Sequence, residues 1–473
     1  MPNFDSNQSA GRQYVPVATF GSIVRRINLQ KRYILAILTS IGFALAFAIR
    51  SNECTFKLDP VHLSNSRGWG ELYFMLGYFF VQIPSVILIN RFSPFKIFGL
   101  LILCSTVIGL GTPIFVKLFH HSWLMYIGFA HGLLQGSAFP AAQAMWQYWA
   151  PPIERSTIIS IAYSGCFFGV AIGAEFSNLV CDLLPSDNVL IVYGLLGIVW
   201  FVLWTWSIYE NPSAHPTITD AELQFLKQSI GNYITTNNTP TSIPWKEIFS
   251  SKSTWALFAA MFCRSWTSLY LIQGDFSEMD FIHEYNTWYV SYPAGAIAIC
   301  LPIVGFLADL LLTKTSKSVA YIRRLYISGG FFVQLLIFIP GIFEFKHVGP
   351  LFLDVLLSCI LYSFIICGFF TNHVDVAPRH AHATMAVSNM MNVVATFLLW
   401  TTFMGIAFEY HEDDTTYQPK TVEEFFLLAA LFHIIGGLTY YFCGSGQTES
   451  WSKPETEAED NRAVSFSNNS IGV

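Results

Sequence analysis

Residues 189–208 read VLIVYGLLGIVWFVLWTWSI, a run of twenty residues without one charged side chain. As an α-helix this run is about 30 Å long, which matches the hydrocarbon core of a bilayer. The run lacks the alternation of apolar and polar residues that marks the strands of membrane barrels. Because lipid offers no hydrogen-bond partners, a spanning segment must satisfy its backbone internally, as a helix does. We therefore predict that residues 189–208 form a transmembrane helix.

The composition of the whole chain extends this conclusion. The chain has 473 residues, of which 53% are hydrophobic and only 12% are charged, whereas an average soluble domain carries about 25% charged residues. This number of charged residues is too small to cover the surface of a soluble protein of this size. We therefore exclude a soluble enzyme and expect the lipid bilayer as a partner. The net charge of -6 gives no indication of nucleic-acid binding.

Motifs that carry catalytic chemistry are not recognisable in the sequence. We find no nucleotide-binding loop, nucleophile triad or cluster of metal ligands, so we expect neither an enzyme nor an ATP-driven pump, and no cofactor or metal. The nine cysteines are scattered without a CxxC pair, which favours a role as small apolar packing residues.

Further apolar runs resemble the first one in length and composition. We predict twelve transmembrane helices at 33–51, 69–90, 95–117, 122–146, 157–180, 189–208, 253–273, 286–312, 321–343, 349–371, 383–408 and 424–443. We expect an all-α membrane protein divided into a cytosolic N-terminal segment (1–32), an N-terminal six-helix bundle (33–209), a cytosolic linker (210–252), a C-terminal six-helix bundle (253–443) and a disordered cytosolic tail (444–473). Tryptophans at the ends of the runs are expected in interfacial belts, as for Trp146, Trp149, Trp245 and Trp255.

The distribution of basic residues predicts the orientation. With the N-terminus in the cytosol, eighteen of the 25 lysines and arginines fall on the cytosolic side and five on the opposite side, while Arg50 and Arg264 lie within spans. Cytosolic loops of membrane proteins carry such an excess of Lys and Arg. We therefore expect both termini in the cytosol.

Two groups of six spans joined by a long cytosolic loop resemble the major facilitator plan, whose halves are related by an axis along the membrane normal. After the eighth span, Gly305, Ala308, Asp309 and Lys314 follow one another as in the loop signature of that superfamily. We expect Asp309 to act at a gate on the cytosolic side.

Five strings carry a more specific resemblance. They are WAPPIERS (149–156), YENPSAHPTITD (209–220), FCRSWT (262–267), NHVDVAPRHA (372–381) and GSGQTESW (444–451). In this order they resemble strings of the family that contains the vesicular glutamate transporters, sialin and the type I sodium–phosphate cotransporters, and most of all its glutamate branch. The resemblance implies secondary active transport of an organic anion, L-glutamate first, into acidic vesicles such as synaptic vesicles, with lysosomal or plasma membranes as alternatives. It also implies chloride and protons as regulators or coupled ions, and the fold usually works as a monomer.

Two arginines within spans are the strongest candidates for the substrate site. Arg50 ends the first span and Arg264 lies inside the seventh, at equivalent places in the two halves. An arginine in the bilayer is costly unless it serves a function, and a guanidinium can hold a carboxylate through two parallel bonds. The alternative interpretation is that each is an anchor at a helix end. In the family that these strings resemble, an arginine at the place of Arg50 binds the substrate carboxylate.

Other polar residues receive weaker assignments. Asn372 and His373 match the resembled family and are candidates for the substrate site. Glu71, Glu175 and His131 are candidates for sensing pH or protons, and we expect Glu175 to be buried with Arg50 or His131 as partner. We expect gate salt bridges in the cytosolic loops, formed by Glu154, Arg155, Asp375 and Arg379.

One departure from the resembled family keeps the function open. The glutamate branch has an arginine in the fourth span and a glutamate seven residues later, where this chain has Gly128 and Gln135. Loss of one clamp on a bound carboxylate typically costs a few kcal/mol. We therefore retain two alternatives, namely a transporter of another organic anion or of phosphate, and a non-transporting sensor or trafficking factor on a transporter scaffold.

Overall fold

The computed structural model describes residues 29–51, 60–118, 123–183, 187–231, 242–273, 288–343, 348–409 and 420–453. The N-terminal segment before residue 29, the tail beyond 453 and the polar residues 52–59 after Arg50 lie outside the described residues. Over these ranges the chain is helical and has no strand. The predicted all-α fold is thus confirmed.

The first half of the chain forms α2 (Lys31–Arg50), α3 (Pro60–Phe80), α4 (Gln82–Arg91), α5 (Pro94–Leu118), α6 (Trp123–Trp149), α7 (Arg155–Leu183) and α8 (Asp187–Ser207). The second half forms α11 (Lys252–Gln273), α12 (Trp288–Lys314), α13 (Val319–Phe343), α14 (Val348–Val376), α15 (Ala381–Glu409) and α16 (Lys420–Cys443). We call these groups the N-half and the C-half. Between them lie η2 (Pro212–Ala214), α9 (Asp220–Ile230) and α10 (Trp245–Ser250), and the short helices η5 (Pro378–His380) and η6 (Ser450–Ser452) lie near the end.

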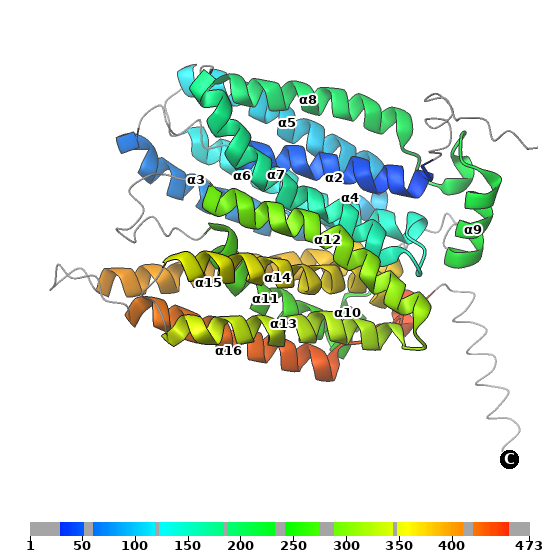
Figure 1. Cartoon of the computed structure of the whole chain (residues 1–473). Coiled ribbons are helices and arrows are strands. Elements are labelled where there is room, and N and C mark those ends of the chain that lie inside the picture. Colours follow the sequence, from blue (N-terminus) through cyan, green and yellow to red (C-terminus); the bar gives the residue numbers. More distant parts are fainter. Residues whose placement is uncertain are drawn as a thin grey trace, which may run out of the picture.

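The long helices run in roughly the same direction, with α5 and α8 along one side of the molecule and α13 and α16 along the other (Figure 1). Within the described residues, seven helices are long and apolar enough to cross a membrane, or eight if the bent pair α3–α4 is one span. Helices α7 and α12 pack closely against each other and join the two halves.

The second predicted span differs from the structure. We predicted 69–90, whereas the helix begins at Pro60 and is bent by 45° where α3 ends and α4 begins. Pro84 explains the bend, because a proline ring clashes with the carbonyl of the residue four positions earlier, here Phe80.

Glycines let helices of the N-half approach each other at backbone distance. A Cβ added at Gly165 or Gly169 of α7 would lie 1.9 Å from the carbonyl oxygen of Ser40 or 2.4 Å from that of Ala44, both on α2. Small residues spaced by four allow this close packing in membrane helices. Helices α2 and α7 of the N-half are therefore packed tightly against each other.

Two predictions about the ends of spans are wrong. Trp146 and Trp149 are buried rather than part of an interfacial belt, and the Trp149 ring packs against His215 of the linker.

Residues 444–453 are ordered rather than disordered. Ser452 is buried, and the backbone N–H of Glu449 donates to the carbonyl of Val376 at 2.9 Å. This segment is ordered because it forms hydrogen bonds with polar backbone groups at the turn between α14 and α15.

Candidate functional site

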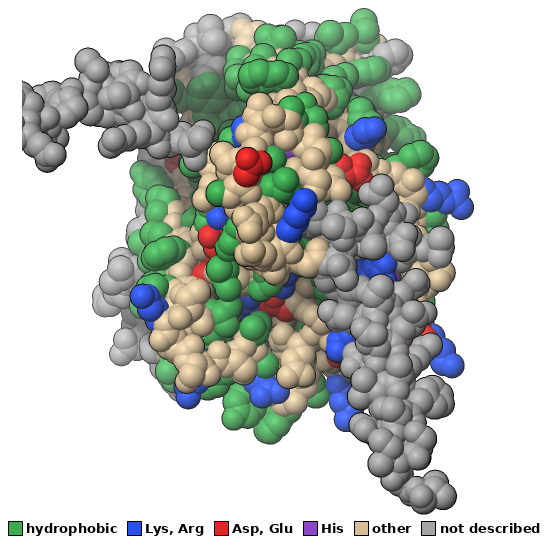
Figure 2. All heavy atoms as spheres, turned by 90° about the vertical axis from the view of Figure 1, so that its right-hand side faces the viewer, with side chains coloured by type: hydrophobic (Ala, Val, Ile, Leu, Met, Phe, Trp, Pro, Cys, Tyr) green, Lys and Arg blue, Asp and Glu red, His purple; other side chains and the backbone are tan. Residues whose placement is uncertain are grey.

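One end of the helix bundle is rich in basic side chains. Figure 2 looks onto this end, where blue Lys and Arg side chains are scattered over the face and around its rim. Exposed basic residues of this end are Arg91, Lys96, Lys227, Lys246, Lys252, Lys314, Lys317 and Arg324. We call it the basic end and use it as the reference for depth within the bundle.

Arg264 of α11 is a buried guanidinium with no acidic partner among the described residues. Its side chain is held by the hydroxyl of Tyr362, to which Nη1 donates at 2.6 Å, and by the sulfur of Met261 at 2.9 Å. The Nε atom has no hydrogen-bond partner, and no carboxylate of the described residues lies within salt-bridge distance. A buried charge without a counter-ion is expensive, so this position is suited to receive an anion.

Aromatic rings on α14 stabilise the same charge. The guanidinium of Arg264 lies 5.4 Å from the ring centre of Tyr362 and 5.5 Å from that of Phe369. Such contacts contribute about 0.5–2 kcal/mol to holding a cation. These contacts offset part of the free-energy cost of burying the charge, but the Nε–H group of Arg264 still has no hydrogen-bond acceptor among the described residues.

Arg50, at the end of α2, differs from Arg264 because it already has a counter-ion. Its Nη2 forms an ion pair with the carboxylate of Glu71 on α3, and its guanidinium lies 3.9 Å from the ring centre of Phe74. Both charged side chains are partly exposed. The two candidate arginines are therefore not equivalent, since only Arg264 has no acidic partner among the described residues.

Tyr78 lies on α3, one turn beyond Phe74, and its ring centre is 5.9 Å from that of Phe74, the ring that faces Arg50.

Asn372 and His373 lie near Phe369 on α14 and bond to neighbouring helices, but Oδ1 of Asn372 is buried without a partner among the described residues. The Asn372 amide donates to the Tyr440 hydroxyl. His373 is bonded at Nδ1 to Thr384 at 3.0 Å and at Nε2 to Ser388 at 3.4 Å. The two bonds of His373 favour a supporting role behind Arg264, whereas Asn372 keeps an unused acceptor.

The three candidates for sensing pH are separated. Glu71 pairs with Arg50, as described. His131 is buried and bonded to Ser105 at 3.0 Å, within electrostatic range of Arg50. The prediction that Glu175 is buried is wrong: its side chain is exposed and accepts a hydrogen bond from Ser291 of α12. Its hydrogen bond to buried Ser291 places it on the side of α7 that faces α12.

Gly128 marks a helix contact that leaves no room for a larger side chain. A Cβ at this position would lie 2.6 Å from the backbone oxygen of Gly70, and one at Gly132 would lie 2.1 Å from that of Phe74. Gln135 donates to the carbonyl of Ala46 at 3.0 Å, while its Oε1 is buried without a partner in the described part of the chain. Helices α3 and α6 are thus in close backbone contact at the level of Gly128.

Ion pairs join the two halves at the basic end. Asp375 of α14 accepts from Arg155 of α7 at 2.7 Å and from Arg323 of α13 at 2.6 Å. Arg323 is buried and also donates to Ser156 at 2.9 Å. This network bridges α7 of the N-half to α13 and α14 of the C-half.

Asp309 of α12 reinforces the same junction. Its carboxylate accepts from the backbone N–H groups of Ser156 at 3.1 Å and Thr157 at 2.7 Å, which belong to the first turn of α7. Carboxylates at helix N-termini satisfy free N–H groups and interact favourably with the helix dipole. Arg379 instead donates to the backbone of Lys453 at 3.4 Å, within the C-half.

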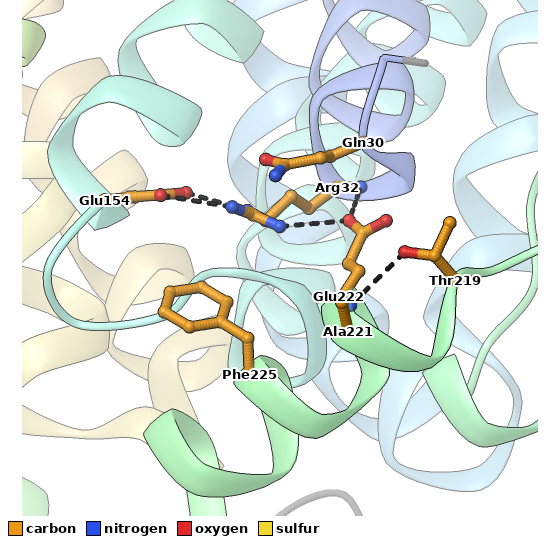
Figure 3. A pocket seen from close by; sticks show the side chains of 7 residues that line it. All are labelled: Gln30, Arg32, Glu154, Thr219, Ala221, Glu222 and Phe225. Carbon is orange, nitrogen blue, oxygen red and sulfur yellow. Dashed lines mark hydrogen bonds and ion pairs between the residues drawn. The ribbon is translucent and has the colours of Figure 1, made fainter. Parts of the chain in front are cut away.

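The sequence interpretation missed a third polar cluster at the basic end. Buried Arg32 pairs with Glu154 at 2.7 Å and with Glu222 of α9 at 3.1 Å (Figure 3). Glu222 also accepts from the backbone N–H groups of Lys31 and Arg32, and so caps α2. The adjoining cavity of about 310 Å³ is lined by these three paired charges together with Gln30, Thr219, Ala221 and Phe225. An arginine in the first turn of a span, followed by an acidic linker helix, was the available signal.

Comparisons with known proteins agree with this architecture. The family model described as Major Facilitator Superfamily matches residues 59–399. The chain is 31% identical over 454 residues to the probable vesicular glutamate transporter eat-4 of Caenorhabditis elegans, covering 91% of this chain and 77% of that one. It is 28% identical over 460 residues to human vesicular glutamate transporter 2, covering 92% and 77%. Among solved structures, the proton:xylose symporter XylE has a similar fold, with a TM-score of 0.65, 12% identity and coverage of 88% and 97%.

Proposed function

Because this chain belongs to the Major Facilitator Superfamily and, within it, to the family of the vesicular glutamate transporters, we propose that it is a secondary active transporter for a small organic anion. The observation that carries the proposal is Arg264, a buried guanidinium without a carboxylate partner among the described residues. A substrate carboxylate at this place would supply the missing counter-ion and the missing acceptors.

We propose that the basic end marks the cytosolic face and that transport runs from there into a vesicle. The assignment to the cytosol rests on the enrichment of cytosolic loops in Lys and Arg. In an acidic vesicle with a positive interior, each negative charge moved inward gains about 2.3 kcal/mol per 100 mV. We propose a vesicle membrane as the location, after the names of the relatives, with the halves rocking about the central site.

L-Glutamate is the first substrate to test, because the relatives are named for it. A second candidate is an anion with one carboxylate and no second acidic group. The Arg50–Glu71 ion pair favours this candidate, because Arg50 could hold a second carboxylate only after releasing Glu71. The tight contact at Gly128 favours it too, since it leaves no room for an additional clamp.

The test is uptake of labelled anions into proteoliposomes with an imposed interior-positive potential. L-Glutamate, a short monocarboxylate and inorganic phosphate would be compared for the wild type, Arg264→Ala and Lys314→Ala. The last variant removes an exposed positive charge from the basic end and serves as the matched control. We expect uptake that follows the potential, is lost in Arg264→Ala and is retained in Lys314→Ala.

Each other outcome has a definite meaning. Uptake that persists in Arg264→Ala removes this residue from the site. Uptake of the monocarboxylate without glutamate selects the second candidate. A folded protein that carries none of the three anions contradicts the proposal and favours a sensor on a transporter scaffold.

A further inference from the structure

Three aromatic rings form a stack where the two halves meet. Phe370 of α14 stacks on Tyr163 of α7 with ring centres 4.1 Å apart and an angle of 10° between the rings. Phe139 of α6 lies 6.2 Å from Phe370 and 5.7 Å from Tyr163, again nearly parallel. Two rings belong to the N-half and one to the C-half, so the stack exists only while the halves are together at this level.

The side chain of Gln143 holds the stack in place. This residue of α6 is completely buried. Its amide oxygen accepts from the Tyr163 hydroxyl at 2.7 Å, and its amide nitrogen donates to the carbonyl of Phe370 at 2.6 Å. One amide therefore binds both sides of the interface, and separating the halves leaves its buried groups without partners.

The stack lies between the candidate site and the ion pairs of the basic end. Phe369, the residue before Phe370, contacts the guanidinium of Arg264. Asp375, which carries the ion pairs to Arg155 and Arg323, lies five residues farther toward the basic end of α14, or about 8 Å along the helix. A solute leaving Arg264 toward the basic end thus meets the aromatic stack first and the ionic layer second.

We propose that Phe370 is the inner gate of the transporter, closing the path from Arg264 to the basic end by stacking on Tyr163 and Phe139. The proposal rests on the proposed transport function and adds the residue that separates substrate from the cytosol. Helix α14 links binding to the gate. An anion on Arg264 competes with the Tyr362 hydroxyl and the Phe369 ring for the guanidinium, and so loosens α14 beside Phe370.

A native cysteine offers a measurement that does not depend on transport. Cys166 is buried and lies on α7, three residues beyond Tyr163 on the side away from Arg155. A small, charged methanethiosulfonate reagent would be applied from the face of the basic end to protein in proteoliposomes. Modification of Cys166 would be followed by mass spectrometry of its peptide. We expect modification about tenfold faster in Phe370→Ala than in the wild type, because the stack that closes the path is lost.

Matched variants separate the gate from a general loosening of the fold. Phe364→Ala removes a ring from the same helix that packs on Tyr326 within the C-half, and it should react like the wild type. Phe370→Leu keeps an apolar side chain without stacking and should be intermediate. The rates would also be measured with Arg155→Ala, which weakens the ionic layer that the reagent meets first. Equal rates for Phe370→Ala, Phe364→Ala and the unsubstituted residues in both backgrounds would overturn the gate. Because the labelling rate needs no substrate, a chain that fails every uptake assay still reveals whether Phe370 closes the path to Cys166.

Discussion

Arg50 at the end of α2 and Glu71 on α3 form an ion pair in which the carboxylate occupies one edge of a guanidinium that otherwise faces the ring of Phe74. We propose that a substrate carboxylate would have to compete with Glu71 for Arg50. On that proposal Glu71 acts as a competitor of the substrate rather than as a solvated residue at the start of a helix.

Neutralising Glu71 should strengthen binding of the anion. In Glu71→Gln the charge of Arg50 becomes available, and we expect KM to fall by about threefold, since partly exposed pairs contribute about 0.2–1 kcal/mol. The measurement is initial uptake over a range of substrate concentrations. Glu247→Gln, at an exposed position of α10, is the control, and a KM that rises in Glu71→Gln would contradict the competition.

Restoring the family's arginine at position 128 should damage the protein rather than improve it. The added Cβ of Gly128→Ala or Gly128→Arg meets the backbone of Gly70 at 2.6 Å, and overpacking of this kind typically costs about 1–3 kcal/mol. We expect a lower Tm for both variants in a thermal-stability assay in detergent. Gly329→Ala, whose Cβ would find its nearest neighbour at 3.8 Å, should melt like the wild type. Higher uptake in Gly128→Arg would show that the α3–α6 contact can open.

Asp375 should couple the two halves energetically. Breaking a buried ion pair by removing one partner costs about 3–5 kcal/mol, and Asp375→Asn leaves both Arg155 and Arg323 without their carboxylate. We expect a large loss of stability, and a double-mutant cycle with Arg155→Ala should give effects smaller than the sum of the single changes. Additive effects would mean that the bridge between the halves carries no coupling.

Glu222 should fasten the linker helix α9 to the N-half. The Glu222→Ala variant removes one of the two carboxylate partners of buried Arg32 and also the cap of α2. Loss of a helix cap costs about 0.5–2 kcal/mol, so hydrogen exchange should become faster in α9 and in the first turn of α2. Glu247→Ala is the control on α10. If hydrogen exchange in α9 stays as slow in Glu222→Ala as in the wild type, Glu222 does not fasten α9 to the N-half.

The helical architecture was predictable because it depends on local patterns. Apolar runs of bilayer length and the polar stretch 210–252 are visible residue by residue, and they lead to the observed fold. The bend before Pro84 could also have been anticipated from the proline, whereas the start of that helix at Pro60 could not, since residues 60–69 are too polar to indicate a span.

The partners within the site depend on which faces of distant helices meet. Arg264 was identified by its position in an apolar run, but its contact with Tyr362 joins residues 98 positions apart. Glu175 was misjudged because a carboxylate in an apolar run looks buried, whereas its side chain is exposed beside α12, where it bonds to Ser291. The stack of Phe139, Tyr163 and Phe370 left no signal among the chain's 43 phenylalanines.

The ordered segment after α16 has a practical consequence for anyone who labels or shortens this protein. Glu449 accepts hydrogen bonds from Ser251 and Ser253 at the start of α11, and Thr448 donates to the backbone of Asp375. Cutting the chain at Cys443 would therefore remove a brace from the residue that bridges the two halves. A fluorescent protein or affinity tag is better joined after Lys453, where it leaves that brace intact.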